Sequence, residues 1–231
     1  MLHGFSLTGA ALAPLAERLA GFETLVPDLP GHGGTTGFTA DLGGAAAMLD
    51  MLLEDGPALL VGWSLGALIA WRRLRHPMVA GVVSLDMSPR PAPDWAFGMS
   101  GPAPEGLASP EAWRKGAPAL AQGLFAQGGG RASTGLIRQI ANRDLAAMRG
   151  FWASLIAEDA RDAIAASPKP LLAIHGAQSR VYPAGTAAWI AATAPAARAH
   201  LLDGAGHAPH LEAPEVTADL IACFAREVLP R

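Results

Sequence analysis

Short apolar runs recur along the chain, and most of them precede a segment with the spacing of a helix. This alternation is typical of a parallel sheet covered by helices on both faces. In such sheets the functional groups lie on the loops that follow the carboxyl ends of the strands. The runs predicted to be strands are residues 23–27, 58–63, 81–86, 170–175 and 198–202.

The pattern changes between residues 87 and 167. Residues 87–110 contain six prolines and three glycines, which excludes a core helix or strand there. Helical spacing returns in residues 111–127 and 133–149, on either side of three consecutive glycines. We predict that 87–167 form a helical lid over the carboxyl edge of the sheet, inserted into a core made of 1–86 and 168–231.

Composition and charge narrow the class of protein. The chain has 231 residues, of which 51% are hydrophobic and 16% charged, as expected for one well-buried globular core with an insert. A formal net charge of −3 provides no basic field for nucleic acid. The longest apolar stretch, residues 59–71, is shorter than the roughly 20 residues of a membrane span. We expect no nucleic-acid partner and no span.

Cysteine usage and the first residues bear on the compartment. Cys223 is the only cysteine, so no internal disulfide can form. The segment after Met1 lacks the charged-then-apolar pattern of a secretory signal. We therefore expect a cytoplasmic protein.

The sharpest candidate for chemistry is the pentapeptide Gly-Trp-Ser-Leu-Gly at positions 62–66. It follows an apolar strand-like run and precedes a helix-like one. A serine on such a turn presents its hydroxyl above the sheet, and glycines on both sides let the strand and helix approach closely. We predict that Ser64 is a nucleophile.

A serine hydroxyl needs a base within hydrogen-bond reach, and His207 is the candidate. It follows the last predicted strand in a loop with two glycines, and the order serine, acid, histidine fits this architecture. His210 is the nearest competitor, and we assign it a structural role. His175 ends a strand and is a candidate contact near the site.

Four ordered motifs resemble those of the α/β-hydrolase family: His-Gly-Phe at 3–5, Asp-Leu-Pro-Gly-His-Gly at 28–33, the pentapeptide at 62–66 and Gly-Ala-Gly-His at 204–207. The resemblance implies an α/β-hydrolase fold, with a mostly parallel sheet and a lid inserted after strand six. It also implies an oxyanion hole formed by the backbone N–H groups of Phe5 and Leu65. His3 and His32 would hold loops by hydrogen bonds.

The acid departs from the family's commonest pattern, which places an aspartate in the segment after the next-to-last strand. Here Ser179 stands at that position, and a hydroxyl cannot offset the charge of an imidazolium. Asp86, one strand earlier, resembles the acid of an esterase branch that has a serine at the usual position. We predict Asp86 as the acid and Ser179 as an auxiliary partner near His207. The alternative is that Asp86 only caps the turn into the lid.

The beginning of the chain also departs from the family. Relatives have two strands before the His-Gly segment, whereas Met1 lies only two residues upstream of His3. We expect either a sheet that is short at one edge or a chain recorded without its natural N-terminus. An exposed edge would favour a homodimer.

These residues predict a serine esterase that cleaves small or medium acyl esters through an acyl-enzyme, with no metal or other cofactor. The serine in the pentapeptide at 62–66 argues against the dehalogenases and epoxide hydrolases of this fold, which attack with a carboxylate.

Two alternatives to a small-ester esterase stay open. The lid arginines resemble those of esterases that demethylate a carrier-bound pimeloyl ester, which implies carrier-bound esters or thioesters and an acyl carrier partner. A non-catalytic binding protein on the same fold is the other. Predicted substrate contacts in the lid are Trp95, Trp113, Phe125 and Trp152.

Overall fold

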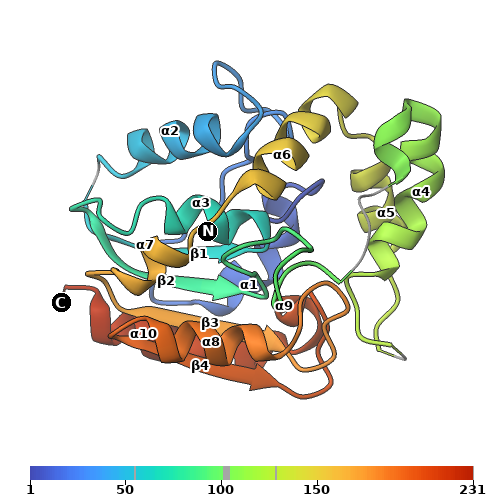
Figure 1. The fold of residues 1–231 in the computed structure, drawn as a ribbon. Coiled ribbons are helices and arrows are strands. Elements are labelled where there is room, and N and C mark those ends of the chain that lie inside the picture. The colour runs from blue at the N-terminus through green and yellow to red at the C-terminus, as the bar shows by residue number, and fades with distance from the viewer. Residues whose placement is uncertain (55, 101–104, 128, 231) are drawn as a thin grey trace.

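A parallel sheet forms the centre of the molecule, as the sequence predicted, and it holds four of the five expected strands. The computed structural model describes residues 1–54, 56–100, 105–127 and 129–230. The strands lie side by side in the order β1-β2-β3-β4, and each pairs in parallel with the next (Figure 1). They are β1 (Ala58–Trp63), β2 (Val79–Leu85), β3 (Leu171–Gly176) and β4 (Ala197–Leu202).

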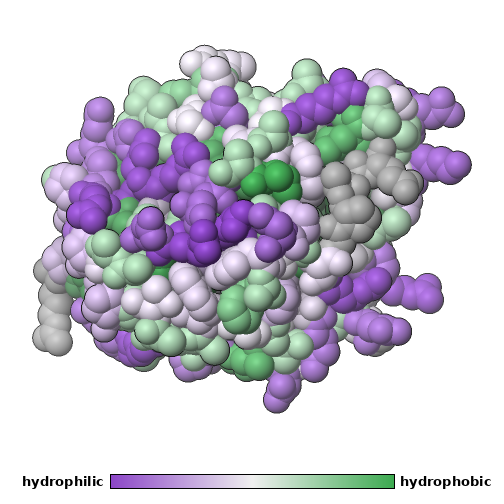
Figure 2. All heavy atoms as spheres, viewed as in Figure 1, coloured by the Kyte–Doolittle hydropathy of each residue, from purple (hydrophilic) through white to green (hydrophobic). Residues whose placement is uncertain are grey.

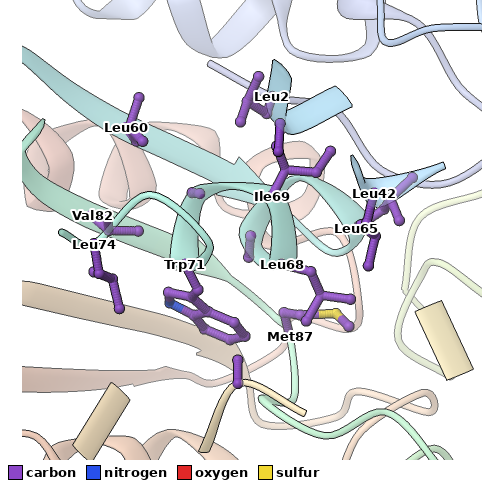
Figure 3. Close-up of a cluster of buried hydrophobic side chains, with 14 of the residues drawn as sticks. Leu2, Leu42, Leu60, Leu65, Leu68, Ile69, Trp71, Leu74, Val82 and Met87 are labelled. Atoms are coloured by element: carbon purple, nitrogen blue, oxygen red, sulfur yellow. The ribbon is translucent and has the colours of Figure 1, made fainter. Parts of the chain in front are cut away.

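Successive strand residues serve two separate cores, because side chains alternate across a sheet. Leu60 and Val82 pack in one cluster with helices α2 (Leu42–Leu52), α3 (Leu65–Trp71), α7 (Arg161–Ala165) and α8 (Gly185–Thr193). The next residues, Val61 and Val83, pack in the second core cluster with α1 (Ala13–Arg18) and α10 (Pro214–Val228). Figure 3 shows the first cluster, in which the side chains of α3 meet those of the strands. Helices thus cover both faces of the sheet.

Among the described helices outside the inserted segment, α2 (Leu42–Leu52) begins with a side-chain cap. Asp41 caps α2 by accepting a hydrogen bond from Gly44 N at 2.8 Å. No helix of the described residues is long and apolar enough to cross a membrane. The helices and the short 3₁₀ turn are η1 (Gly9–Ala11), α1 (Ala13–Arg18), α2 (Leu42–Leu52), α3 (Leu65–Trp71), α8 (Gly185–Thr193), α9 (Pro209–Glu212) and α10 (Pro214–Val228).

The expected strand at residues 23–27 was wrong. This segment is extended but forms no strand, and Leu25 is 56% exposed. Val26 packs against the second core cluster, and the ammonium group of Met1 donates to Leu25 O at 2.5 Å. Leu2 in turn forms a single parallel bridge with Gly62 on the outer edge of β1. Without a paired strand beside it, residues 23–27 have no ladder to join. A groove of about 530 Å³ lies along this edge.

The segment between β2 and β3 holds the helices that the sequence predicted as a lid. Helices α4 and α5 lie beyond the carboxyl ends of the strands, whereas α6 runs alongside α2 (Figure 1). Residues 101–104 of the proline-rich stretch and residue 128 of the glycine run are outside the described residues. The division into core and lid domains stays a prediction. The elements are η2 (Glu105–Ala108), α4 (Pro110–Gln122), α5 (Thr134–Ala141), α6 (Leu145–Ala157) and α7 (Arg161–Ala165).

One helix predicted over 133–149 is in fact two. Helix α5 ends at Ala141, and α6 begins at Leu145. Asp144 starts the second helix by accepting hydrogen bonds from Ala146 N at 2.6 Å and Ala147 N at 3.3 Å. Apolar periodicity runs through this junction, but a residue that caps a new helix breaks the old one.

Hydrophilic side chains cover much of the face that Figure 2 shows. Part of this cover is a set of ion pairs around the ends of α3, α6 and α7, including Arg72 with Glu158 and Arg161 with Asp159. Such exposed pairs each contribute about 0 to 1 kcal/mol. They keep this face solvated rather than hold the fold together.

Gly66, in the first turn of α3, lies very close to the backbone at Leu2. A Cβ at Gly66 would lie 2.2 Å from Leu2 O, whereas one at Gly116 in α4 would meet nothing within 4 Å. We expect Gly66→Ala to lower the free energy of unfolding by about 1 to 3 kcal/mol through overpacking. Gly116→Ala is the matched control and should raise it by about 0.5 to 1 kcal/mol. Denaturant unfolding of both variants measures this difference, and equal values would contradict it.

Candidate active site

Three residues from separate strand ends meet at the carboxyl edge of the sheet. Ser64 follows β1, Asp86 follows β2, and His207 comes after β4. His207 Nε2 lies 3.0 Å from Ser64 Oγ, and His207 Nδ1 lies 2.7 Å from Asp86 Oδ1. A carboxylate only accepts hydrogen bonds, so Nδ1 is the donor, and Nε2 can accept the serine proton. The structure therefore joins the three residues in one hydrogen-bonded chain.

The backbone at Ser64 is held in a conformation that side chains rarely adopt. Its φ is 51° and its ψ is −118°. Among the described non-glycine residues, positive φ occurs only at Ser6, Ser64 and Asp86. All three lie at this site, which is where proteins keep such strain. Gly62 makes the turn at Ser64 possible, because a Cβ there would lie 2.4 Å from Ala67 N.

Asp86 is fully buried, with no exposed surface. Its Oδ2 accepts a hydrogen bond from Gly176 N at 2.9 Å, and Oδ1 accepts one from Ser179 Oγ at 2.7 Å. His175 Nε2 lies 3.4 Å from Oδ2. A buried carboxylate without such partners would cost several kcal/mol. Asp86 thus does more than cap a turn, since its side chain reaches across to β3 and to His207.

Ser179 contacts the carboxylate and not the imidazole. Its hydroxyl donates to the same Asp86 oxygen that His207 approaches. The same Ser179 Oγ accepts long hydrogen bonds from Val181 N and Tyr182 N, each at 3.4 Å. Ser179 therefore ties the loop after β3 to the acid.

Phe5 and Leu65 offer the two backbone N–H groups expected beside the serine. Leu65 is the first residue of α3, so its N–H has no acceptor within the helix. In the described part of the chain, neither N–H has a hydrogen-bond partner. Phe5 also lines the cavity in front of Ser64. Both donors are free to bind an oxygen there.

A cavity of about 570 Å³ opens in front of Ser64 and His207. Trp113 and Trp152 line it, as the sequence predicted for two of the four lid aromatics. Trp113 also stacks edge-on against Phe5, with ring centroids 6.0 Å apart. The remaining walls are mostly apolar and include Met99, Leu120, Leu124, Ile140, Leu155 and Val181.

The other two predicted substrate contacts do not line this cavity. Trp95 packs against Phe97 and Trp189 at centroid distances of 5.3 Å, with Arg161 over its ring. Phe125 is 7% exposed and packs in the second core cluster. Both aromatics are used in packing the lid onto the core.

Sequence reasoning missed the part that Trp63 plays. Its indole N–H donates to His207 O at 2.7 Å, and both side chains are buried. A buried tryptophan needs an acceptor for its indole proton. The tryptophan in the pentapeptide was therefore the signal that could have indicated this contact. Trp63 thus fixes the loop that carries the imidazole.

Glu212 supports the same loop from the other side. It accepts hydrogen bonds from Gly206 N at 2.6 Å and from Ala126 N at 2.9 Å. One carboxylate therefore joins the residue before His207 to the inserted segment.

Three buried histidines outside this chain of residues stay neutral. Burial lowers the pKa of His3 to about 4, and those of His32 and His210 to about 3. His3 Nε2 accepts from Leu29 N at 2.9 Å, so it links the first loop to the Asp-Leu-Pro-Gly-His-Gly segment. His210 packs edge-on against Trp63, with centroids 4.4 Å apart. In the described residues, no group of three or more His, Cys, Asp or Glu side chains could hold a metal ion.

Comparisons with known proteins give the family. A model described as the Alpha/beta hydrolase family matches residues 1–220. This chain belongs to that family. It is 34% identical to the Pimeloyl-[acyl-carrier protein] methyl ester esterase of Aromatoleum aromaticum, over 96% of this chain and 95% of the relative. The protein of the same name from Xanthomonas campestris is 30% identical over 97% and 93%.

Solved structures show the same fold at lower identity. A putative aryl esterase from Burkholderia cenocepacia has a TM-score of 0.84 and 24% identity, covering 100% of this chain and 90% of that one. The N-acyl homoserine lactonase AidH has a TM-score of 0.82 and 24% identity, with the same coverage. The predicted fold and the predicted class of carboxylic ester hydrolase are confirmed.

The neutral histidines make stability depend on pH. A lowered pKa in the folded state means that the unfolded chain binds more protons below about pH 6.5, so stability falls as pH falls from there. We expect His210→Asn to reduce the slope of unfolding free energy between about pH 5 and pH 6 by about 1 kcal/mol per pH unit.

The matched control for that prediction is His200→Asn, which changes an exposed side chain in β4. Denaturant unfolding across this pH range gives the slopes. If both variants keep the slope of the unchanged protein, burial of a neutral imidazole at position 210 is not a source of the acid sensitivity.

Proposed function

We propose that this protein is a serine esterase that cleaves carboxylic esters through an acyl-enzyme on Ser64. The observation that carries the proposal is the contact of His207 Nε2 with Ser64 Oγ at 3.0 Å beside the 2.7 Å contact of His207 with Asp86. A serine hydroxyl becomes a useful nucleophile when a base with a fixed orientation removes its proton.

In the first half of the reaction, Ser64 Oγ attacks the ester carbonyl carbon, and its proton passes to His207 Nε2. Asp86 stabilises the resulting imidazolium without becoming protonated itself. The tetrahedral intermediate then expels the alcohol, whose oxygen takes the proton from His207. In the second half, His207 removes a proton from water, which attacks the acyl carbon. The bond between that carbon and Ser64 Oγ then breaks, His207 returns the proton to Ser64 Oγ, and the acid leaves. This route needs no metal or organic cofactor.

The N–H groups of Phe5 and Leu65 bind the oxyanion that forms at each attack. Support comes from their place beside Ser64 and from their lack of an acceptor in the described residues. The position of Leu65 at the start of α3 adds the favourable end of the helix dipole. In a comparable site, one such donor contributes about 3 to 4 kcal/mol to transition-state stabilisation.

The apolar cavity favours esters with an aliphatic or aromatic acyl group of small or medium size. Its walls include Trp113, Trp152 and Leu124, which would bury such a group from water. Ser179 acts through Asp86, because its hydroxyl keeps the carboxylate oriented toward His207.

A second candidate substrate is a methyl ester bound to an acyl carrier. The observation in its favour is that the relatives named as Pimeloyl-[acyl-carrier protein] methyl ester esterase match almost the whole chain. Hydrolysis of a carrier-bound methyl ester at a kcat/KM far above that of the free methyl ester would support this candidate. Equal values would favour small free esters. The cytoplasmic location and the homodimer stay predictions.

The acid is tested by comparing Asp86→Asn with Ser179→Ala on one ester. Loss of the charged acid should lower kcat by about 10⁴-fold, since the imidazole then has the wrong tautomer and no counter-charge. Loss of the Ser179 hydroxyl removes one of several hydrogen bonds to Asp86 and should cost less than about tenfold. Similar small losses in both variants would assign the acid role to another residue.

Replacing the proposed nucleophile distinguishes an enzyme from a non-catalytic binding protein with the same fold. Ser64→Ala should reduce turnover of p-nitrophenyl butyrate by about 10⁶-fold, the scale for loss of the nucleophile in a comparable triad. Ser154→Ala in α6 is the matched control, because its hydroxyl contacts Leu42 N and does not line the cavity. Turnover that survives in Ser64→Ala, or that is absent from the unchanged protein, would contradict the proposal.

A further inference from the structure

Among the side chains that the structure describes, Arg180 alone brings a permanent charge to the cavity in front of Ser64. It is exposed, and the other described lining residues are glycines, apolar or aromatic residues, two serines and His207. None of these described lining residues is an aspartate or a glutamate. An apolar cavity of this kind binds with few polar contacts, so each of them has a large influence on which ligand fits. Arg180 is the charged group of the described lining, and it has no part in the proposed chemistry.

The backbone of Arg180 is held on both sides by hydrogen bonds. Ser179 N donates to Gly176 O at 3.1 Å, and the Ser179 hydroxyl contacts Asp86. On the other side, Val181 O accepts from Ser100 N at 2.9 Å. The guanidinium therefore projects from a loop that is tied to the acid and to the inserted segment. The fold thus fixes where the backbone of Arg180 lies at the edge of the cavity.

The guanidinium also lacks an ion-pair partner among the described side chains. Several other arginines of this chain, including Arg72 and Arg198, pair with a carboxylate. None of the described carboxylates pairs with Arg180. A guanidinium presents a planar fork of donors that matches a carboxylate or a phosphate. Beside an apolar wall, it favours a ligand with one such group at the end of an apolar chain.

We propose that Arg180 is a specificity-determining residue that binds an anionic oxygen group, a carboxylate or a phosphate, carried by the ester away from the bond that is cleaved. This inference rests on the proposed esterase function and names the substrate class of that site. Neutral esters of the same length remain substrates, because Arg180 takes no part in the attack. The anionic group adds affinity, so the preference resides mainly in KM.

Two pairs of esters test the proposal and distinguish the side of the ester that carries the charge. Mono-p-nitrophenyl adipate and p-nitrophenyl hexanoate have acyl chains of equal length, and only the first ends in a carboxylate. The pair 4-acetoxybenzoate and 4-methylphenyl acetate places the carboxylate on the alcohol side. The measured quantity is the ratio of kcat/KM for the anionic ester to that for its neutral partner.

For one of the two pairs, Arg180→Gln should lower this ratio about tenfold, with kcat/KM of the neutral ester within about twofold. Arg180→Lys should retain part of the preference, and added salt should weaken it because the group is exposed. Arg226→Gln in α10 is the matched control, since it makes the same change in net charge away from the cavity. An unchanged ratio in both pairs, or an equal fall for anionic and neutral esters, would overturn the inference.

Binding to Ser64→Ala protein separates this inference from the proposed function. Calorimetry with monomethyl adipate and methyl hexanoate, with and without Arg180→Gln, requires no turnover. If the unchanged protein hydrolyses no ester but Arg180 still favours the anionic ligand about tenfold, the proposed function fails and the anion site stands. If esters are hydrolysed and Arg180→Gln changes neither binding nor the ratios, the anion site fails alone.

Discussion

The buried carboxylate of Asp86 is the group on which the rest of the site depends. A charge with no exposed surface is stable only when its oxygens are hydrogen-bonded, and the donors here come from Gly176, Ser179 and His207. These donors belong to β3, to the loop after it and to the loop after β4. Satisfying one carboxylate therefore draws three segments together, and the same contacts orient the imidazole toward Ser64.

The parallel sheet makes this convergence possible, and the surrounding residues make it rigid. Trp63 and Glu212 hold the loop of His207 by one hydrogen bond to its carbonyl and one to the preceding N–H. Trp63 belongs to the second core cluster, and Glu212 also accepts a hydrogen bond from Ala126 N in the inserted segment. The groups that would react are thus held by neighbours whose positions are already fixed by packing. An apolar cavity opens in front of them.

Sequence patterns predicted β1, β2 and β3 because these strands are largely buried and read as nearly continuous apolar runs, whereas β4 at the edge of the sheet carries several exposed side chains. They failed at residues 23–27, where an apolar segment has no partner strand, and at Asp144, where a cap divides one periodic stretch into two helices. The pentapeptide indicated Ser64 because its chemistry is local. Trp95 and Phe125 were predicted as substrate contacts, but neither is among the described residues that line the cavity, because the direction in which a lid aromatic points depends on tertiary packing.

The most direct test of the account is the site of covalent labelling by a fluorophosphonate, read by peptide mass spectrometry on protein with confirmed ester turnover. Attack by an activated serine should place the adduct on Ser64 in nearly every molecule, with loss of turnover in proportion to labelling. His207→Ala should label far more slowly, because the hydroxyl then keeps its proton. Complete inhibition with the adduct on another residue, or full activity with Ser64 labelled, would contradict the account.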